Sequence, residues 1–139
     1  MRGLHLTADL HGCAAAAALL ADADGLRALA LRAVRAAGLT PLGDLFHRFG
    51  APGGVTGMVL LAESHLALHT WPELAAATLD VYVCNRGADN SAAAEALLSA
   101  MEAAFAPLHS ERRCVVRGDV TAPIQIGAAH RGVSPRAAR

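Results

Sequence analysis

The sequence lacks an excess of charge of either sign. Among its 139 residues, 12 lysines and arginines balance 12 aspartates and glutamates, and only 17% of residues are charged. A balance of this kind gives no overall field that would favour nucleic acid or an anionic membrane surface, so we expect neither as a partner. The length suits one domain, which we expect at residues 1–118, followed by a flexible tail at 119–139.

The sequence also has no apolar run long enough to cross a membrane. Hydrophobic residues make up 54% of the chain, but no run of them reaches the roughly 20 residues that a membrane helix needs. The N-terminus does not follow the charged-then-apolar pattern of a signal peptide, because His5, Asp9 and His11 interrupt it. We therefore expect a cytoplasmic protein.

Closely spaced cysteines are absent as well. The three cysteines, Cys13, Cys84 and Cys114, are scattered and form no CxxC motif. This spacing argues against a disulfide framework and against a structural zinc site, and it suits the reducing environment of the cytoplasm.

Hydrophobic periodicity predicts that strands and helices alternate along the chain. One helix has Asp22 or Asp24 as its N-cap and ends at Gly38, and a second follows Ser91 and ends before Pro107. Strands are predicted at residues 4–10, 42–49, 55–62, 79–83 and, at an edge, 114–117. The simplest fold is an α+β two-layer sandwich, in which two helices pack on one face of a mainly antiparallel sheet. The other face would need a cover, which a second copy of the protein could supply.

Polar side chains gather in one short segment of an otherwise aliphatic chain. Residues 62–73 read AESHLALHTWPE and combine the hydroxyl of Ser64, the imidazoles of His65 and His69 and two carboxylates. The thiol of Cys84 follows a short way on. A core strand rarely carries such groups unless they hydrogen-bond or react, so this segment is the candidate functional site.

Several interpretations of this segment stay open on spacing alone. His65 and His69 would share one face of a helix and could bind a metal ion, but Pro72 makes a helix unfavourable there. Ser64 with His69 and a carboxylate could form a hydrolase triad, although no Gly-x-Ser-x-Gly elbow surrounds the serine. Cys84 could act as a nucleophile with a histidine, yet a lone cysteine on an apolar strand is more often simply buried.

The order of several short motifs resembles the S-adenosylmethionine decarboxylase family of bacteria and archaea. The motifs are FHRF at 46–49, GVTG at 54–57, ESHL at 63–66, HTWPE at 69–73 and DVYVC at 80–84. The resemblance runs over residues 3–117, and the ESHL and HTWPE motifs are highly specific in combination.

This resemblance implies that the chain is an inactive precursor that cuts itself between Glu63 and Ser64. The hydroxyl of Ser64 attacks the Glu63 carbonyl, an ester replaces the amide, and elimination followed by hydrolysis turns Ser64 into a covalent pyruvoyl cofactor. By the same resemblance, His69 takes the proton removed in the elimination. Thr56 stands where a serine commonly supports the processing, and it keeps the hydroxyl.

The resemblance also implies the reaction of the mature enzyme. The pyruvoyl carbonyl condenses with the α-amine of S-adenosylmethionine and accepts the electrons left when CO2 departs. Cys84 matches the general acid that protonates the substrate, Phe49 the aromatic ring that stacks on adenine, and Glu73 the carboxylate that binds the ribose hydroxyls. The implied enzyme is a homodimer of cleaved protomers that needs no metal and supplies aminopropyl groups for spermidine biosynthesis.

Some assignments stay open at this point. Asp9 stands where many relatives have glutamate, Phe46 could be either a core or a substrate-binding residue, and the remaining histidines have no role. Decarboxylation of ornithine or arginine on the same scaffold is an alternative activity. An uncleaved regulatory paralogue of an active enzyme is an alternative from another class.

Overall fold

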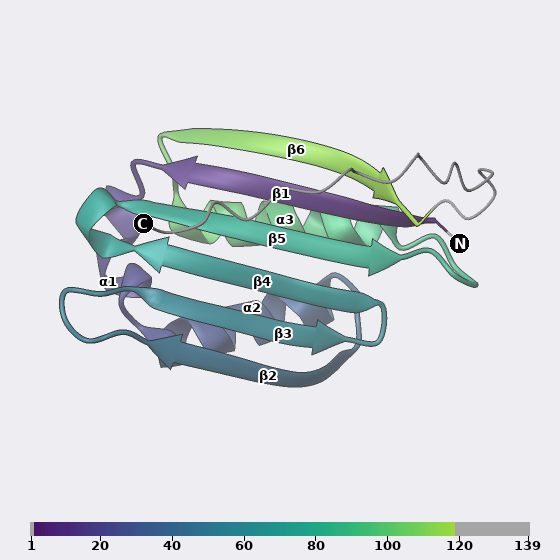
Figure 1. The fold of residues 1–139 in the computed structure, drawn as a ribbon, viewed down its shortest axis with the longest axis horizontal. Helices are drawn as coiled ribbons and strands as arrows, with labels where there is room; N and C mark the ends of the chain where they lie inside the picture. The colour runs from purple at the N-terminus through teal and green to yellow at the C-terminus, as the bar shows by residue number, and fades with distance from the viewer. Residues whose placement is uncertain (1, 119–139) are drawn as a thin grey trace, which may run out of the picture.

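The computed structural model describes residues 2–118, which form one six-stranded sheet with helices on one face (Figure 1). All the strand pairs are antiparallel, and the strand order is β2-β3-β4-β5-β1-β6. The strands are β1 (Gly3–His11), β2 (Pro41–Arg48), β3 (Val55–Leu61), β4 (Ser64–Trp71), β5 (Ala76–Cys84) and β6 (His109–Arg117). The helices are α1 (Ala17–Leu20), α2 (Ala23–Ala36) and α3 (Ser91–Phe105), with 3-10 turns η1 (Ala14–Ala16) and η2 (Pro72–Leu74).

The helices form the second layer of the sandwich. Helix α2 packs on β2 and β3, and α3 packs on β1 and β5, so both cover the same face of the sheet. The core lies between the two layers and is built from the strand residues that alternate toward the helices, such as Leu6, Ala8 and Leu10 of β1. The predicted α+β sandwich with a mainly antiparallel sheet is confirmed.

Helix α2 begins and ends as its sequence predicts. The side chain of Asp22 caps the helix by accepting a hydrogen bond of 2.9 Å from the backbone N–H of Gly25. Gly38, just beyond the helix, has a φ of 79°, a left-handed conformation that glycine adopts at little cost. The inward face of α2 buries Leu26, Ala30, Ala33 and Val34.

Helix α3 holds the edge strand β6 against the sheet through one buried carboxylate. Glu102 accepts hydrogen bonds from Ser110 and Arg112 of β6. Burial would raise the pKa of Glu102, but the hydrogen bonds from Arg112 and Ser110 and the charge of Arg112 outweigh it and lower that pKa. The carboxylate therefore stays ionised and paired at neutral pH, and it fixes the edge of the sheet.

The structure departs from the predicted elements in the short helix α1, which was not predicted, and in three strands. The apolar run at 55–62 ends at a two-residue turn of Ala62 and Glu63, so Ser64 opens a new strand that pairs back on β3. Strand β5 begins at Ala76 and β6 at His109, both earlier than predicted. Strand β5 begins with alanines, and the edge strand β6 begins with polar and charged residues. Neither start alternates apolar with polar residues, which explains why both were missed in the sequence. The predicted tail at 119–139 lies outside the described residues.

A buried threonine joins three elements near the end of β4. Thr70 is fully buried, and its Oγ1 accepts from the Val55 N–H at 2.8 Å and donates to the Leu20 carbonyl at 2.6 Å. Thr70→Val keeps the shape but leaves these two backbone groups without their partner, which costs about 1–3 kcal/mol for each group. We expect a clearly lower midpoint of unfolding in urea, whereas Thr40→Val, at an exposed position, should change it little.

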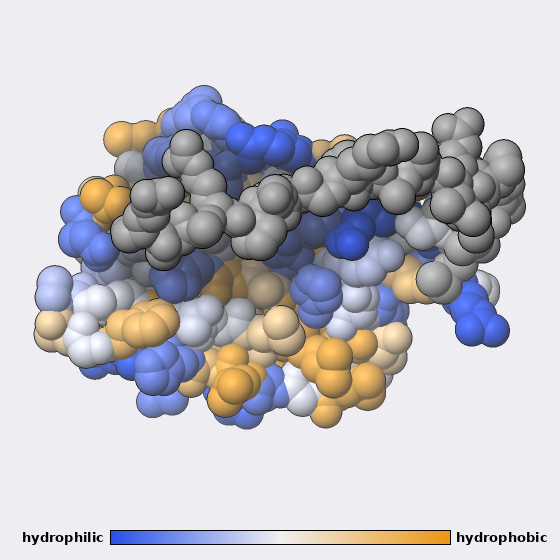
Figure 2. All heavy atoms as spheres, viewed as in Figure 1, coloured by the Kyte–Doolittle hydropathy of each residue, from blue (hydrophilic) through white to orange (hydrophobic). Residues whose placement is uncertain are grey.

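The face of the sheet opposite the helices has no covering layer within residues 2–118 (Figure 2). Apolar side chains gather over β2 and β3 on this open face, where Leu45, Met58 and Leu60 are each about half exposed or more. Polar side chains lie beside them on β4, β5 and β1. All the candidate site residues that lie on strands belong to this face or its ends.

Candidate active site

The residues that the sequence singles out form two groups at opposite ends of β4. Ser64 is the first residue of this strand, and His69 lies five residues further along. At about 3.3 Å per residue, their Cα atoms are roughly 16 Å apart. Cys84 lies with Ser64, whereas Thr56, Phe49 and Glu73 lie toward the His69 end. A single copy of the protein therefore does not bring the two groups into contact with each other.

The first group is centred on the peptide bond between Glu63 and Ser64. A two-residue hairpin turn usually needs positive φ at one or both central positions, which favours Gly, Asn or Asp. Here Ala62 and Glu63 make the turn, and the positive φ, 154°, falls on Ser64 instead. A non-glycine residue held in this region stores about 1–3 kcal/mol of strain. The strain sits on the residue whose nitrogen belongs to the predicted scissile bond.

The backbone of Cys84 contacts the carbonyl group of that bond. Its N–H donates a hydrogen bond of 2.8 Å to the Glu63 carbonyl oxygen. Thr40 holds the turn from the other side, because its N–H donates to Glu63 Oε2 at 3.1 Å and its carbonyl accepts from Ala62 N–H at 2.9 Å. A donor aimed at this oxygen polarises the carbonyl and stabilises negative charge that develops on it.

Three further residues that the sequence left without a role form a chain of contacts that begins at Ser64. Its Oγ lies 3.1 Å from Nδ1 of His65, and Nε2 of His65 lies 3.1 Å from Asp80 Oδ1. Nε2 of His5 lies 2.7 Å from the other oxygen of Asp80. Strand pairing assembles this cluster, since His5 and His65 both pair with Tyr82, two residues from Asp80. In the sequence, the only sign of this cluster is the two-residue alternation of the strands, which places His5, His65 and Asp80 on the same face of the sheet.

The second group is an aromatic cluster beside Thr56. The ring of His69 lies 5.6 Å from that of Phe49 and 4.3 Å from that of Trp71, measured between centroids. Thr56 of β3 pairs directly with His69. Glu73 follows in η2, where its side chain is exposed. Phe49 and Thr56 thus lie beside His69 at one end of the open face, and Glu73 follows four residues after His69, in η2.

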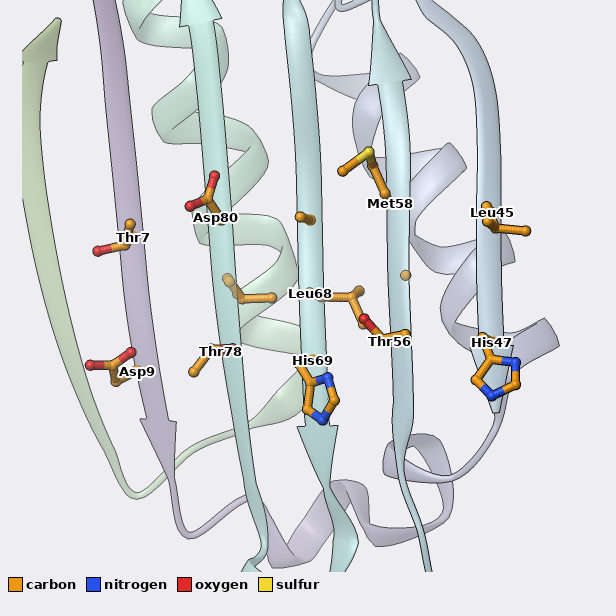
Figure 3. A pocket seen from close by; sticks show the side chains of 13 residues that line it. Thr7, Asp9, Leu45, His47, Thr56, Met58, Leu68, His69, Thr78 and Asp80 are labelled. Carbon is orange, nitrogen blue, oxygen red and sulfur yellow. The ribbon is translucent and has the colours of Figure 1, made fainter. Parts of the chain in front are cut away.

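A hollow of about 620 Å³ lies on the open face between the two groups (Figure 3). Thr56 and His69 line one end of it, and Asp80 lies toward the other. Asp9 also lines it and accepts a hydrogen bond of 2.6 Å from Arg113 of β6. Carboxylates and hydroxyls on an apolar floor suit a small ligand that carries positive charge and hydrogen-bonding groups.

Comparison with known proteins decides the family. A family model described as S-adenosylmethionine decarboxylase matches residues 4–114. Proteins named S-adenosylmethionine decarboxylase proenzyme from Thermococcus onnurineus and Persephonella marina are 34% and 37% identical to the chain. These alignments cover 86% and 92% of this chain and 82% and 90% of the relatives. The chain belongs to the S-adenosylmethionine decarboxylase family.

A solved structure supports the same assignment. The crystal structure of the adenosylmethionine decarboxylase from Aquifex aeolicus is 36% identical, with a TM-score of 0.76, and the match covers 85% of this chain and 92% of that chain. Both groups of site residues lie within the part of the chain that matches the S-adenosylmethionine decarboxylase family model. The predicted membership of a decarboxylase family is confirmed.

The geometry also narrows the interpretations that the sequence left open for this family member. His65 and His69 lie on one strand, roughly 13 Å apart, so they do not share a metal ion. Within residues 2–118 there is no cluster of three or more potential metal ligands and no helix long and apolar enough to cross a membrane.

Phe46 packs against the hydrophobic core over Gly57, which assigns it a structural role. Burial raises the pKa of the Cys13 thiol, as expected for a core cysteine.

Proposed function

We propose that the chain is a self-processing, pyruvoyl-dependent decarboxylase that converts S-adenosylmethionine to decarboxylated S-adenosylmethionine and CO2. The product would supply aminopropyl groups for spermidine biosynthesis. The observation that carries the proposal is the geometry at Glu63–Ser64, where a strained serine follows a carbonyl that a backbone N–H polarises. Membership of the family and the names of its relatives support the choice of reaction.

Self-cleavage would begin with attack of Ser64 Oγ on the carbonyl carbon of Glu63. The amide nitrogen leaves as the free amine of Ser64, and an ester joins Glu63 to the Ser64 side chain. This exchange runs uphill because an ester is less stable than an amide, and relief of the strain at Ser64 offsets part of the cost. The N–H of Cys84 would hold the oxyanion of the tetrahedral intermediate.

The pyruvoyl group would then stand at position 64, where it supplies an electron sink for the carbanion left by decarboxylation. The residues around position 64 fit such a group, because position 64 pairs with Val83 of β5 and so lies beside Cys84. Cys84 carries a free, half-buried thiol next to it. We assign this thiol the proton that the substrate carbon receives after CO2 leaves.

Substrate recognition would come from the second group. Phe49 presents an accessible ring that can stack on adenine and attract the sulfonium charge, and 41% of its surface is exposed. The exposed carboxylate of Glu73 can accept hydrogen bonds from the ribose hydroxyls. Thr56 and His69 lie beside Phe49 at the same end of the open face.

We further propose a homodimer in which each active site combines the first group of one protomer with the second group of its partner. A two-fold axis that runs between the two sheets, parallel to them and perpendicular to their strands, would place the two open faces together with their strands reversed. Sheets packed face to face lie about 10 Å apart, so Ser64 and Cys84 of one copy would meet His69 and Phe49 of the other. The exposed Leu45, Met58 and Leu60 would be buried in the contact. Three free cysteines suit a cytoplasmic location.

Parallel measurement of CO2 release from S-adenosylmethionine, ornithine and arginine tests the choice of substrate. We expect activity on S-adenosylmethionine alone, because Phe49 and Glu73 address the adenosyl group. Phe49→Ala should raise the KM for this substrate more than it lowers kcat, since stacking acts on the bound substrate as well as on the transition state. Release of CO2 from ornithine or arginine alone would contradict the proposed substrate, and no release from any of them would favour a regulatory paralogue.

A further inference from the structure

We propose that His65 is the base that takes the proton from Ser64 in the first step of self-cleavage, and that Asp80 is its positioning residue. The proposal rests on the self-cleavage proposed above and names a residue to which no role was given. It divides the work of two histidines: His65 acts at the ester-forming step, and His69 at the later elimination.

The contacts of His65 determine which of its nitrogens carries the proton. Asp80 is an acceptor when ionised, so the nitrogen that faces it, Nε2, is the one that carries hydrogen and donates across 3.1 Å. The lone pair of the neutral ring is therefore on Nδ1. This atom lies 3.1 Å from Ser64 Oγ, and it accepts the hydroxyl proton.

Two further hydrogen bonds extend the cluster beyond Asp80, and each of them also has one donor and one acceptor. His5 donates from Nε2 to the second oxygen of Asp80 at 2.7 Å, and Arg117 donates to Nδ1 of His5 at 3.2 Å. One chain of hydrogen bonds runs from Arg117 through His5 to Asp80. The other runs from Ser64 through His65 to the same carboxylate, and every donor in both chains has an acceptor. Two histidines that donate to one carboxylate hold it in place and fix the orientation of the His65 ring.

The step balances without any further reactant. The proton of Ser64 Oγ passes to Nδ1 of His65 while Oγ forms a bond to the carbonyl carbon of Glu63. The electron pair of the carbonyl moves onto its oxygen, which the N–H of Cys84 holds. The imidazolium formed then faces the carboxylate of Asp80. When the carbon–nitrogen bond breaks, Nδ1 returns the proton to the amine nitrogen of Ser64, and the carbonyl re-forms as an ester.

His69 of the same chain cannot make this contact, because it lies roughly 16 Å further along β4. A second copy of the chain could bring its own His69 to the site, as the proposed dimer requires. The two histidines would then serve different steps, and chemical trapping of the ester can separate them.

The test follows self-cleavage of freshly prepared wild type, His65→Ala and His69→Ala by intact mass, with and without hydroxylamine. Hydroxylamine cuts an ester and releases a fragment that begins with an unmodified serine. We expect His65→Ala to form the ester, and so to cleave, at least about 100-fold more slowly, the usual size of a general-base effect. Hydroxylamine should add no cleavage to it. In His69→Ala the ester should form without elimination, and hydroxylamine should trap it and release the serine-headed fragment.

Imidazole and a control variant complete the design. Imidazole added to folded His65→Ala should raise its cleavage rate, which a purely structural role of the ring would not allow. Asp80→Asn serves if His65→Ala does not fold, and it should also slow cleavage without accumulation of ester. His109→Ala should cleave at the wild-type rate, because this histidine lies on the edge strand beside Glu111 and His11 and has no contact with the Ser64 cluster.

Three results would overturn the role of His65: cleavage of His65→Ala at the wild-type rate, accumulation of a hydroxylamine-sensitive ester in it, or no response of the folded variant to imidazole. For Asp80→Asn, a wild-type rate or accumulated ester would do the same. If wild type itself stays whole, the proposed function fails instead, so the two failures are distinguishable.

Discussion

Replacement of Ser64 by alanine is expected to yield one uncut, folded chain without decarboxylase activity. The methyl group of alanine cannot attack the Glu63 carbonyl, so neither the ester nor the cofactor can form. The core contacts of β4 come from Leu66, Leu68 and Thr70, which the substitution leaves unchanged. Intact mass would show a single full-length species, and circular dichroism would show the wild-type content of strand and helix.

Two companion variants sharpen this prediction. Ser64→Gly should also stay whole, but it should unfold at a higher temperature than Ser64→Ala, because glycine tolerates a φ of 154° that strains alanine. Ser99→Ala, on the exposed side of α3, should cleave as wild type does. A Ser64→Ala chain that is still cut between residues 63 and 64 would rule out the serine as the nucleophile.

Pairing two impaired variants in one dimer is expected to restore activity at limiting substrate. Cys84→Ala removes the thiol from the first group but keeps the backbone N–H, so it should still cleave itself. Phe49→Ala removes the stacking ring from the second group. A dimer with one copy of each variant holds one site with both defects and one site with none, so it should show about half the wild-type activity.

Co-expression of the two variants with different affinity tags, followed by two successive purifications, isolates the mixed dimer for this assay. Dimers of either variant alone provide the baseline, which we expect to be a small fraction of wild type at limiting substrate. Activity of the mixed dimer no higher than this baseline would mean that both groups of one site come from the same chain. That outcome would contradict the proposed dimer and leave the self-cleavage chemistry untouched.

Much of the fold could be predicted from local patterns. The alternation in β1 and the helical period of α2, with its aspartate cap and terminal glycine, are strong signals that the packing then reinforces. The hairpin between β3 and β4 gave no such signal. Ala62 and Glu63 are not turn-forming residues, and the strain that follows from using them appears only in the φ of Ser64.

The candidate site was predictable in its residues and not in its arrangement. Ser64, His69 and Cys84 stand out because polar groups in an aliphatic chain need a reason, and the motif order names the family. Ser64 and His69 are separated because one strand, β4, holds both, and in its register Ser64 pairs with Val83 and His69 with Thr78. The part played by His65 and Asp80 depends on that same register, which a single sequence does not reveal.

Intact mass of the freshly purified wild-type chain tests the central claim most directly. The account predicts two fragments, one of residues 1–63 with an ordinary carboxyl terminus and one of residues 64–139. The second should be lighter by one ammonia than simple hydrolysis would give, and borohydride should reduce its new terminus. A single full-length mass that persists through long incubation, with no carbonyl reactive toward borohydride, would contradict the account.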